Sequence, residues 1–198
     1  MHIAILTFDG FNELDSLVPF GILQRVKIPG WKVSIASPTK QVRSMNGLLL
    51  EAHISLPEAC SADAVLVGSG MATRDVVQNP ALMTQLKLDP ARQLIGAQCS
   101  GTLILAKLGL LEGGVACTDL TTKPWVVEAG VEVLNQPLFA NGNVATAGGC
   151  LASQYLAAWM IARLVGVDEA KNAVHYVAPV GEKDEYVMRA LSNISPYL

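Results

Sequence analysis

The sequence has few charged residues and no long hydrophobic run. Only 16% of its 198 residues are Asp, Glu, Lys or Arg, and the formal net charge is −3. No group of basic residues is dense enough to bind a phosphate backbone, so nucleic acid is not an expected partner. No apolar run reaches the roughly 18 residues that span a bilayer, because glycine and proline interrupt the richest stretches. We therefore expect no membrane segment.

The amino terminus lacks the pattern of a secretory signal. Residues 1–7 form a short apolar run with no basic region before it and no cleavage-site pattern after it. This run predicts a first strand. We expect the protein to remain in the cytoplasm.

The four cysteines, Cys60, Cys99, Cys117 and Cys150, include no C-x-x-C pair. Because a structural zinc site needs clustered ligands, this spacing predicts no metal. Disulfides are not expected in a reducing compartment. Three of the four are typical of small buried hydrophobes, whereas the surroundings of Cys99 indicate a different role.

A complete dinucleotide-binding motif is also missing. Gly68-Ser69-Gly70 follows an apolar run, as the first glycines of such a fingerprint would. Thr73 stands where the third glycine is needed, and Asp89, at the distance of the acidic ribose ligand, precedes Pro90 in an expected loop. We expect no cofactor.

The residues that are present favour a buried parallel sheet. Hydrophobic residues make up 51% of the chain, and short β-rich runs alternate with helical patterns. Strands are expected at 3–7, 31–37, 64–67, 94–98, 115–118, 131–134 and 143–146, with a hairpin at 44–55 turning at Asn46-Gly47. Helices are expected at 14–26, 79–88, 101–111 (closed by Gly113-Gly114), 150–165 and 168–175. The alternation predicts one α/β domain over 1–198, a three-layer sandwich with a mostly parallel, doubly wound sheet.

Cys99 is expected on a sharp turn between a strand and a helix. Ala97 and Gly101, two residues before and after it, are small, as the crowded turn of a nucleophile elbow requires. The elbow places the thiol at a helix N-terminus, where we expect a lowered pKa and a reactive thiolate. Backbone N–H groups there can stabilise a developing negative charge.

Two further loops are expected at the same carboxyl edge of the sheet. The loop of residues 68–71 follows a core strand and can turn its amides toward the elbow. Asp15, after the first strand, can act as an acid beside the thiol. It can equally stabilise the first turn of a helix, as Glu13 can.

Three motifs together carry a family resemblance. They are Phe11…Leu14-Asp15…Pro19-Phe20, Val67-Gly68-Ser69-Gly70 and Ala97-Gln98-Cys99-Ser100-Gly101, with further matches at 109–113, 116–118 and 147–149. Over nearly the whole chain, and in this order, they resemble the ThiJ/PfpI superfamily. That resemblance implies the flavodoxin-like α/β fold of the class I glutamine amidotransferases.

Within this superfamily the chain is most similar to the isonitrile hydratases, which convert R–N≡C and water to an N-substituted formamide. The resemblance implies a lyase with Cys99 as nucleophile, Asp15 as its acid partner, and Ser100 where the hydratases carry threonine. It implies attack of the sulfur on the isonitrile carbon, with water then resolving a thioimidate. The amide of Ser100 is expected to contribute to the anion pocket. The oxyanion and substrate-binding positions are Gly70, Ser69, Met71 and Thr118.

The chain departs from the family pattern in three places. Gly68-Ser69-Gly70 stands where the family's oxyanion loop usually has Pro-Gly-Gly. Ser100 stands where the family's proteases carry a histidine, so peptidase activity is not expected. Asp119 stands where many relatives carry a histidine. The three histidines present match no catalytic position of the family and are expected to be structural: His2, His53 and His175.

The resemblance leaves other functions open. One is a glyoxalase- or deglycase-like reaction on 2-oxoaldehydes. Another is a non-enzymatic redox sensor or stress chaperone, in which Cys99 is oxidised to a sulfinate held by Asp15. A small-molecule partner and a homodimer are implied by the superfamily. The apolar helix 150–165 suits either a dimer interface or ordinary core packing, through Leu156, Trp159, Met160 and Leu164.

Overall fold

Seven strands form the central sheet of the computed structural model, which describes residues 1–111 and 114–198. Their order is β10-β11-β7-β6-β1-β2-β5. Among the described strands of this sheet, only β10 runs antiparallel to its neighbour, β11. The strands are β1 (His2–Leu6), β2 (Lys32–Ser37), β5 (Ile54–Ser55), β6 (Ala64–Val67), β7 (Leu94–Gln98), β10 (Leu138–Asn141) and β11 (Val144–Ala147).

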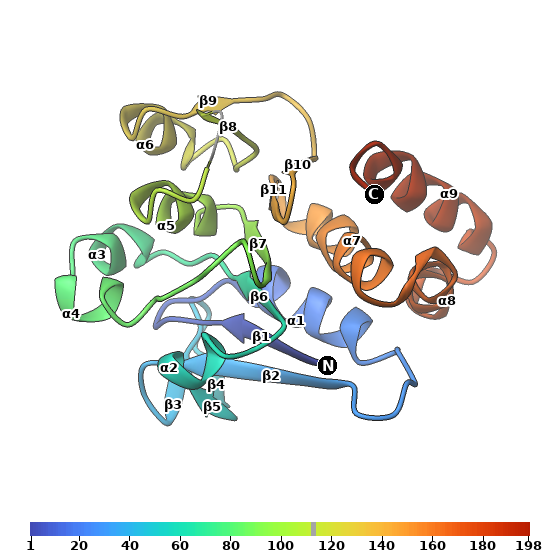
Figure 1. Ribbon diagram of the computed structural model, residues 1–198, viewed down its shortest axis with the longest axis horizontal. Coiled ribbons are helices and arrows are strands. Elements are labelled where there is room, and N and C mark those ends of the chain that lie inside the picture. The colour runs from blue at the N-terminus through green and yellow to red at the C-terminus, as the bar shows by residue number, and fades with distance from the viewer. Residues whose placement is uncertain (112–113) are drawn as a thin grey trace.

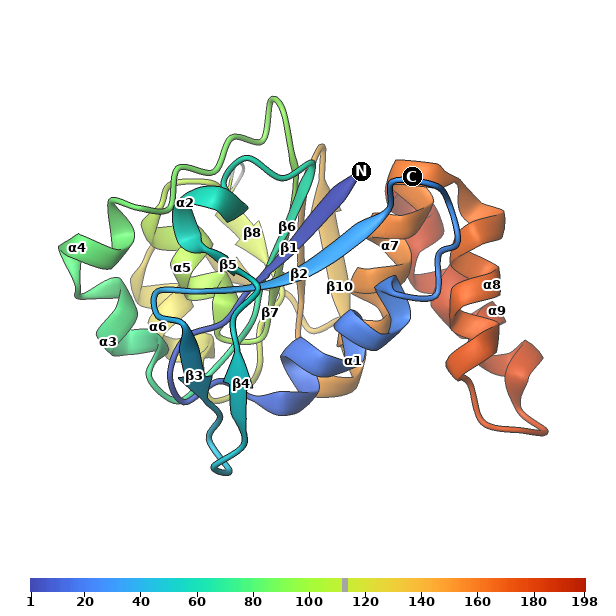
Figure 2. The ribbon, with the colours of Figure 1, turned by 90° about the horizontal axis from the view of Figure 1, so that it is seen from below.

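Helices cover both faces of the sheet, which gives the expected three layers (Figure 1 and Figure 2). One layer contains α1 (Glu13–Leu23), α7 (Ser153–Val165), α8 (Val167–Val177) and α9 (Lys183–Ile194). The opposite layer contains α2 (Leu56–Ala59), α3 (Thr73–Val77), α4 (Pro80–Met83), α5 (Gly101–Lys107) and α6 (Lys123–Glu128). The mostly parallel α/β sandwich is therefore confirmed. No helix in the described part of the chain is long and apolar enough to cross a membrane.

The two faces of the sheet bury separate hydrophobic clusters. In β1, Ile3 and Ile5 belong to the cluster under α1 and α7, whereas Ala4 and Leu6 belong to the cluster on the other face. Side chains alternate between the faces of a strand, so a sheet covered on both sides needs a continuous apolar run. The run at the amino terminus meets this requirement.

Helix α7 lies inside the chain's own core. Leu156, Trp159 and Met160 are fully buried, and α7 packs against α1, α8 and α9. Because these three helices cover α7, its side chains are removed from water, which accounts for their apolar character. Of the two roles expected for these side chains, the structure shows core packing.

Several boundaries differ from expectation. The hairpin pairs β3 (Gln41–Arg43) with β4 (Leu49–Glu51) around the expected Asn46-Gly47 turn, and β5 leaves it to join the sheet edge. Helix α4 ends at Met83, and α5 ends at Lys107 because the chain reverses at Gly109, whose φ is +72°. Gly113-Gly114 was expected to end this helix, and Gly113 lies outside the described residues.

Some short elements do not belong to the main sheet or to the long helices. β8 (Val115–Ala116) pairs in parallel with β9 (Glu132–Val133) as a separate two-stranded sheet. A 3-10 turn, η2 (Cys150–Ala152), precedes α7, and a second, η3 (Ser195–Tyr197), follows α9.

Glu13 attaches the hairpin to the first turn of α1. Its carboxylate accepts hydrogen bonds from the Ser44 hydroxyl and from the backbone and side-chain amides of Asn46, the latter at 3.3 and 2.9 Å. These bonds, led by that of Ser44, lower the pKa of Glu13 below its ordinary value of 4.5. The carboxylate is thus stabilised in the folded chain.

We expect Glu13→Gln to lower the melting temperature at neutral pH by about 2 °C. A depressed pKa adds stability above the unfolded value of 4.5, and this stability is lost as the pH falls through the lower folded value. The melting temperatures of the wild type and the variant should therefore converge as the pH falls below 4.5. Glu132→Gln, at an exposed position, is the control; an equal effect there would refute this role of Glu13.

Candidate active site

Cys99 occupies the strained turn expected of a nucleophile elbow. It lies between β7 and α5, and it is the one non-glycine residue with a positive φ, +48°, in the described part of the chain. A left-handed conformation is costly for a side chain with a Cβ and persists only when the surroundings enforce it. The strand, turn and helix therefore hold the sulfur in a fixed place.

Gly101 makes this turn sterically possible. A Cβ at that position would lie 2.5 Å from the backbone oxygen of Val67 and 2.8 Å from that of Gly68. Both are backbone atoms of β6 and its loop, so neither can move away without displacing the sheet edge. Glycine is required because α5 starts in direct contact with the neighbouring strand.

Two groups outside the turn hold the backbone of Cys99. Its N–H donates to the carbonyl of Ala147 at 2.8 Å, and its carbonyl accepts from the hydroxyl of Thr118 at 2.8 Å. The N–H of Ser100 donates to no protein acceptor among the described residues. That amide, at the start of α5, remains available to a developing negative charge.

Asp15 lies beside Cys99, in the first turn of α1. Because β1, β6 and β7 are parallel neighbours, the loops that follow them meet at one edge of the sheet. Asp15 is fully buried there, and it accepts a hydrogen bond from the hydroxyl of Ser69. Glu13 points instead to the hairpin, so the two acids have separate roles.

Ser100 connects the elbow to the loop after β6. Its hydroxyl accepts the N–H of Gly70 at 3.1 Å and lies 2.7 Å from the hydroxyl of Thr73. The amide of Gly70 is therefore directed at Ser100 in this structure. Met71, one of the expected substrate-binding residues, is 72% exposed, whereas Phe11, in the loop after β1, is buried.

A second thiol, Cys150, completes the cluster. One ligand atom from each of Asp15, Cys99 and Cys150 lies within 4.8 Å of the other two. Cys150 is half-buried in η2, after the Gly148-Gly149 turn. Cys150 lies 51 residues after Cys99 in the chain, so the sequence alone did not indicate that the two thiols are neighbours. The parallel pairing of β11 with β7 brings them together.

The surroundings of the thiol do not lower its pKa as expected. Burial, and then the nearby carboxylate of Asp15, raise the pKa of Cys99 well above its ordinary value. Burial also raises the pKa of Asp15, against the hydrogen bond from Ser69. A buried site with no compensating cation disfavours each anion, so the expectation of a free thiolate at rest is wrong. Burial and the neighbouring carboxyl group favour the protonated thiol instead.

A cavity of about 440 Å³ borders the cluster on the side of β8 and β11. Cys99 itself is only 3% exposed. The cavity is lined by residues of the two loops that hold the elbow and of the connection between β9 and β10, among them Thr118, Asp119, Lys123, Gln136, Gly148 and Gly149. Two of these residues adjoin the cluster, because Thr118 is bonded to the carbonyl of Cys99 and Gly149 precedes Cys150.

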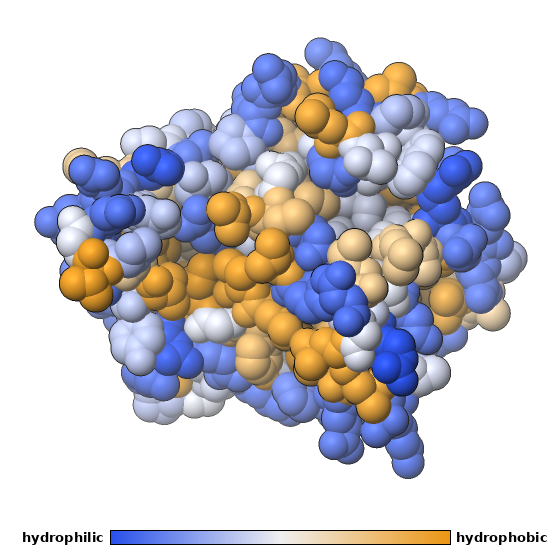
Figure 3. All heavy atoms as spheres, turned by 180° about the vertical axis from the view of Figure 1, so that it is seen from behind, coloured by the Kyte–Doolittle hydropathy of each residue, from blue (hydrophilic) through white to orange (hydrophobic). Residues whose placement is uncertain are grey.

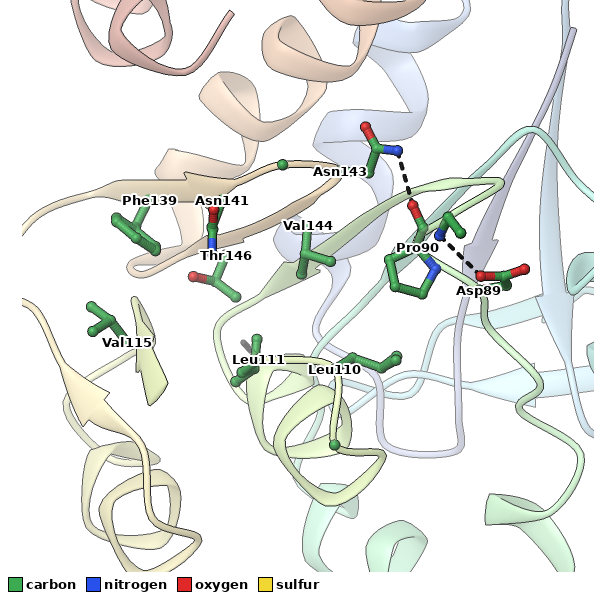
Figure 4. Close-up of a pocket in the computed structure, with 13 residues that line it drawn as sticks. Asp89, Pro90, Leu110, Leu111, Val115, Phe139, Asn141, Asn143, Val144 and Thr146 are labelled. Atoms are coloured by element: carbon green, nitrogen blue, oxygen red, sulfur yellow. Dashed lines mark hydrogen bonds between the residues drawn. The ribbon is translucent and has the colours of Figure 1, made fainter. Parts of the chain in front are cut away.

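A second cavity, of about 470 Å³, lies at the amino ends of β7 and β11, opposite the carboxyl edge that holds the elbow (Figure 4). Leu110, Leu111, Val144 and Phe139 form its apolar walls. Its position separates it from the thiol cluster.

The carboxyl edge of the sheet has an apolar rim. It faces away from the viewer in Figure 1 and toward the viewer in Figure 3, where a band of hydrophobic side chains crosses the surface. Exposed hydrophobic residues in the loops of this edge include Leu14, Met45, Leu48, Leu49, Met71, Leu120 and Leu151. Such a rim favours contact with apolar groups.

Two of the histidines have structural bonds. His2 Nε2 lies 2.9 Å from the hydroxyl of Ser34, and His53 Nδ1 accepts the N–H of Ile35 at 3.0 Å. Both bonds attach to β2, and two strands, β6 and β1, separate β2 from β7 and the elbow. Asp119, at the position where many relatives carry histidine, accepts the amides of Thr121 and Thr122, both at 2.9 Å.

Comparison with known sequences gives a consistent result. The profile of the DJ-1/PfpI family matches residues 1–163. Isonitrile hydratase of Pseudomonas putida is 24% identical over 173 residues, which are 86% of this chain and 75% of that protein. Glutathione-independent glyoxalase DJ-1 of Schizosaccharomyces pombe is 24% identical over 160 residues, 75% of this chain and 83% of that protein.

Solved structures share the fold. Schizosaccharomyces pombe DJ-1 superposes with a TM-score of 0.77 at 18% identity, over 90% of this chain and 100% of that chain. A ThiJ/PfpI family protein from Pseudomonas syringae superposes with a TM-score of 0.79 at 19% identity, over 98% of this chain and 87% of that chain.

Proposed function

The chain belongs to the DJ-1/PfpI family, and from this premise we propose that it is a cysteine-dependent enzyme that hydrates an organic isonitrile to an N-substituted formamide. The observation that carries the proposal is the thiol of Cys99 on a strained elbow, beside the buried carboxylate of Asp15. The similarity to isonitrile hydratase supports this reaction.

The first step uses the proton of the Cys99 thiol and the carboxylate of Asp15. The sulfur attacks the terminal carbon of R–N≡C, and the thiol proton passes to the carboxylate of Asp15. Asp15 then delivers that proton to the same carbon, which gives a thioformimidate, R–N=CH–S–Cys99. The pair carries one negative charge throughout, so a buried site has no charge separation to stabilise.

The second step uses water. Water adds to the thioformimidate carbon, the nitrogen takes up a proton, and the bond between sulfur and carbon breaks. The product is R–NH–CHO, and the thiol regains its proton. The free N–H of Ser100 lies at the turn, where it can stabilise charge on the entering oxygen.

The substituent R is expected to be apolar. The rim of the carboxyl edge is formed by exposed side chains such as Met71, Leu120 and Leu151, which match an alkyl or aryl isonitrile better than an anionic substrate. Transfer of such groups from water to an apolar surface is favourable.

A second candidate reaction is the conversion of a 2-oxoaldehyde to a 2-hydroxy acid. It is favoured by the similarity to the glutathione-independent glyoxalase of Schizosaccharomyces pombe. In that reaction the thiol would form a hemithioacetal, and Asp15 would move a proton between neighbouring carbons.

A two-substrate assay separates the candidates. Formamide formed from an alkyl isonitrile, with no lactate formed from methylglyoxal, supports hydration. The reverse result supports the glyoxalase reaction. The absence of both products refutes the enzymatic proposal and favours the sensor role through oxidation of Cys99. A homodimer and a cytoplasmic location remain predictions.

We expect Asp15→Asn to lower the turnover rate by about 10²-fold or more, because the amide cannot relay the thiol proton. The same change removes a buried carboxylate whose pKa burial has raised, so the melting temperature should not fall and is expected to rise. Steady-state kinetics and thermal denaturation measure the two effects.

Asp184→Asn, in the exposed first turn of α9, is the matched control and should change neither quantity. A variant at Asp15 with full activity would contradict the role of this carboxylate. A variant that loses activity through unfolding would show a lowered melting temperature instead.

A further inference from the structure

The cluster of Asp15, Cys99 and Cys150 has features that proton transfer at Cys99 does not require. Oδ2 of Asp15 is bonded by Ser69, whereas Oδ1 is buried and accepts no N–H or O–H among the described residues; the thiols of Cys99 and Cys150 are the donors that act on this carboxyl group. Thiols are weak hydrogen-bond donors, so this buried acceptor is poorly satisfied. This oxygen lies in a site with two sulfur atoms that can ligate a cation.

Each sulfur atom accepts an N–H from a side-chain amide. Gln98 Nε2 donates to the Sγ of Cys99 at 3.3 Å, and Asn12 Nδ2 donates to the Sγ of Cys150 at 3.3 Å. Amide donors of this kind stabilise thiolate ligands and orient them toward a metal. The two donors come from β7 and from the loop before α1, so the fold itself aims them.

No cation of the protein neutralises this cluster. Within the described residues the one ion pair is Lys171–Asp168, on the surface of α8. The other charged group that acts on Asp15 and Cys99 is Asp119, which is also an acid. A buried carboxylate with two thiols and no basic partner is a site where a bound cation would supply the missing positive charge.

We propose that Asp15, Cys99 and Cys150 form a binding site for one thiophilic divalent cation, of the zinc or cadmium type. In a tetrahedral zinc site with Zn–S bonds of about 2.3 Å, two sulfur atoms lie about 3.8 Å apart. The ligand atoms here lie within 4.8 Å of one another, so rotations of the two thiol side chains bring them to that spacing. Three protein ligands leave the fourth position open to water.

One of the proposed ligands follows directly on a residue that lines a cavity. Gly149 lines the cavity of about 440 Å³, and the half-buried Cys150 is the next residue. The ion would meet Cys150 before it meets the more deeply buried Cys99. If the proposed reaction is correct, and this consequence rests on it, the bound ion occupies the nucleophile and inhibits hydration.

Titration with Cd²⁺ tests the site on the purified, reduced protein. Cadmium–thiolate bonds give an ultraviolet charge-transfer absorption, which reports coordination without any substrate. We expect the absorption to saturate at one ion per chain. Cys150→Ala should weaken the binding by about 100-fold or more, because it removes a direct ligand. Cys60→Ala, at a cysteine bonded to the carbonyl of Gln85 outside the cluster, should leave the binding unchanged.

A second variant, Asp15→Asn, removes the carboxylate ligand and keeps both thiols; it should weaken binding by about 10-fold or more. Each variant is first shown to fold by its melting temperature. Equal cadmium affinity in wild type and Cys150→Ala, or an equal loss in Cys60→Ala, would overturn the proposal. The absorption needs no turnover, so the two proposals can fail separately. A protein that binds cadmium but is inactive would refute the reaction and leave the metal site standing. A protein that is active but does not bind cadmium would refute the metal site and leave the reaction standing.

Discussion

Replacing Cys99 with alanine is expected to reduce isonitrile hydration by about 10³-fold or more. No other described thiol takes its place, because the elbow positions only this sulfur at the free N–H of Ser100, in reach of the buried Asp15. The residual rate would come from binding and from the anion pocket alone. Formamide production measured by chromatography gives the ratio of rates directly.

The matched control is Cys60→Ala, which removes a buried thiol at the end of α2, bonded to the carbonyl of Gln85 outside the cluster, and should leave the rate unchanged. Both variants should remain folded, because the surroundings that impose the turn at Cys99 are retained. Full activity of Cys99→Ala would exclude covalent catalysis, whichever of the two substrate classes is used.

The second large effect is expected on stability. Gly101→Ala would place a methyl group 2.5 Å from the carbonyl oxygen of Val67, and overpacking against fixed backbone costs about 1–3 kcal/mol of the free energy of unfolding. The same displacement would move the elbow, so activity should fall as well. Denaturant unfolding measures the loss of stability.

A glycine in open space provides the control. Gly21 lies in α1, and a Cβ there would meet no atom within 4 Å. Because alanine is the better helix former, Gly21→Ala should stabilise the protein by about 0.5–1 kcal/mol. A Gly101→Ala protein as stable as the wild type would show that the contact with β6 is loose.

The elbow could be predicted from the sequence because its physical requirements are local. Small residues at Ala97 and Gly101, an apolar strand before them and a helical pattern after them all lie within one segment. The structure confirms that the strand ends at Gln98 and that the helix begins at Gly101. The loops of Asp15 and Gly70 could be placed at the same edge because parallel strands end together.

The second thiol could not be predicted in this way. Cys150 approaches Cys99 only because β11 pairs with β7 in parallel, and strand order is not encoded in the spacing of residues along the chain. The spacing of the cysteines predicted no metal site, although the fold gathers Asp15, Cys99 and Cys150 into one cluster. Ligands from three separate segments escape any rule based on short motifs.

The ionisation of Cys99 was mispredicted for a related reason. A helix N-terminus favours a thiolate, and this effect can be inferred from the sequence. Complete burial and a carboxylate at contact distance oppose it, and both depend on tertiary structure. The missed elements β10 and α9 also depend on tertiary packing, since β10 is a sheet edge and α9 is largely polar and packs mainly on α7 and α8.

Mass spectrometry of the reacting protein tests covalent catalysis most directly. The protein is mixed with excess alkyl isonitrile, quenched in acid within the first turnovers and digested. We predict an added mass equal to that of the isonitrile on the peptide that contains Cys99, and no such mass in Cys99→Ala. Formamide production with no adduct on Cys99, or with the adduct on Cys150, would contradict the account.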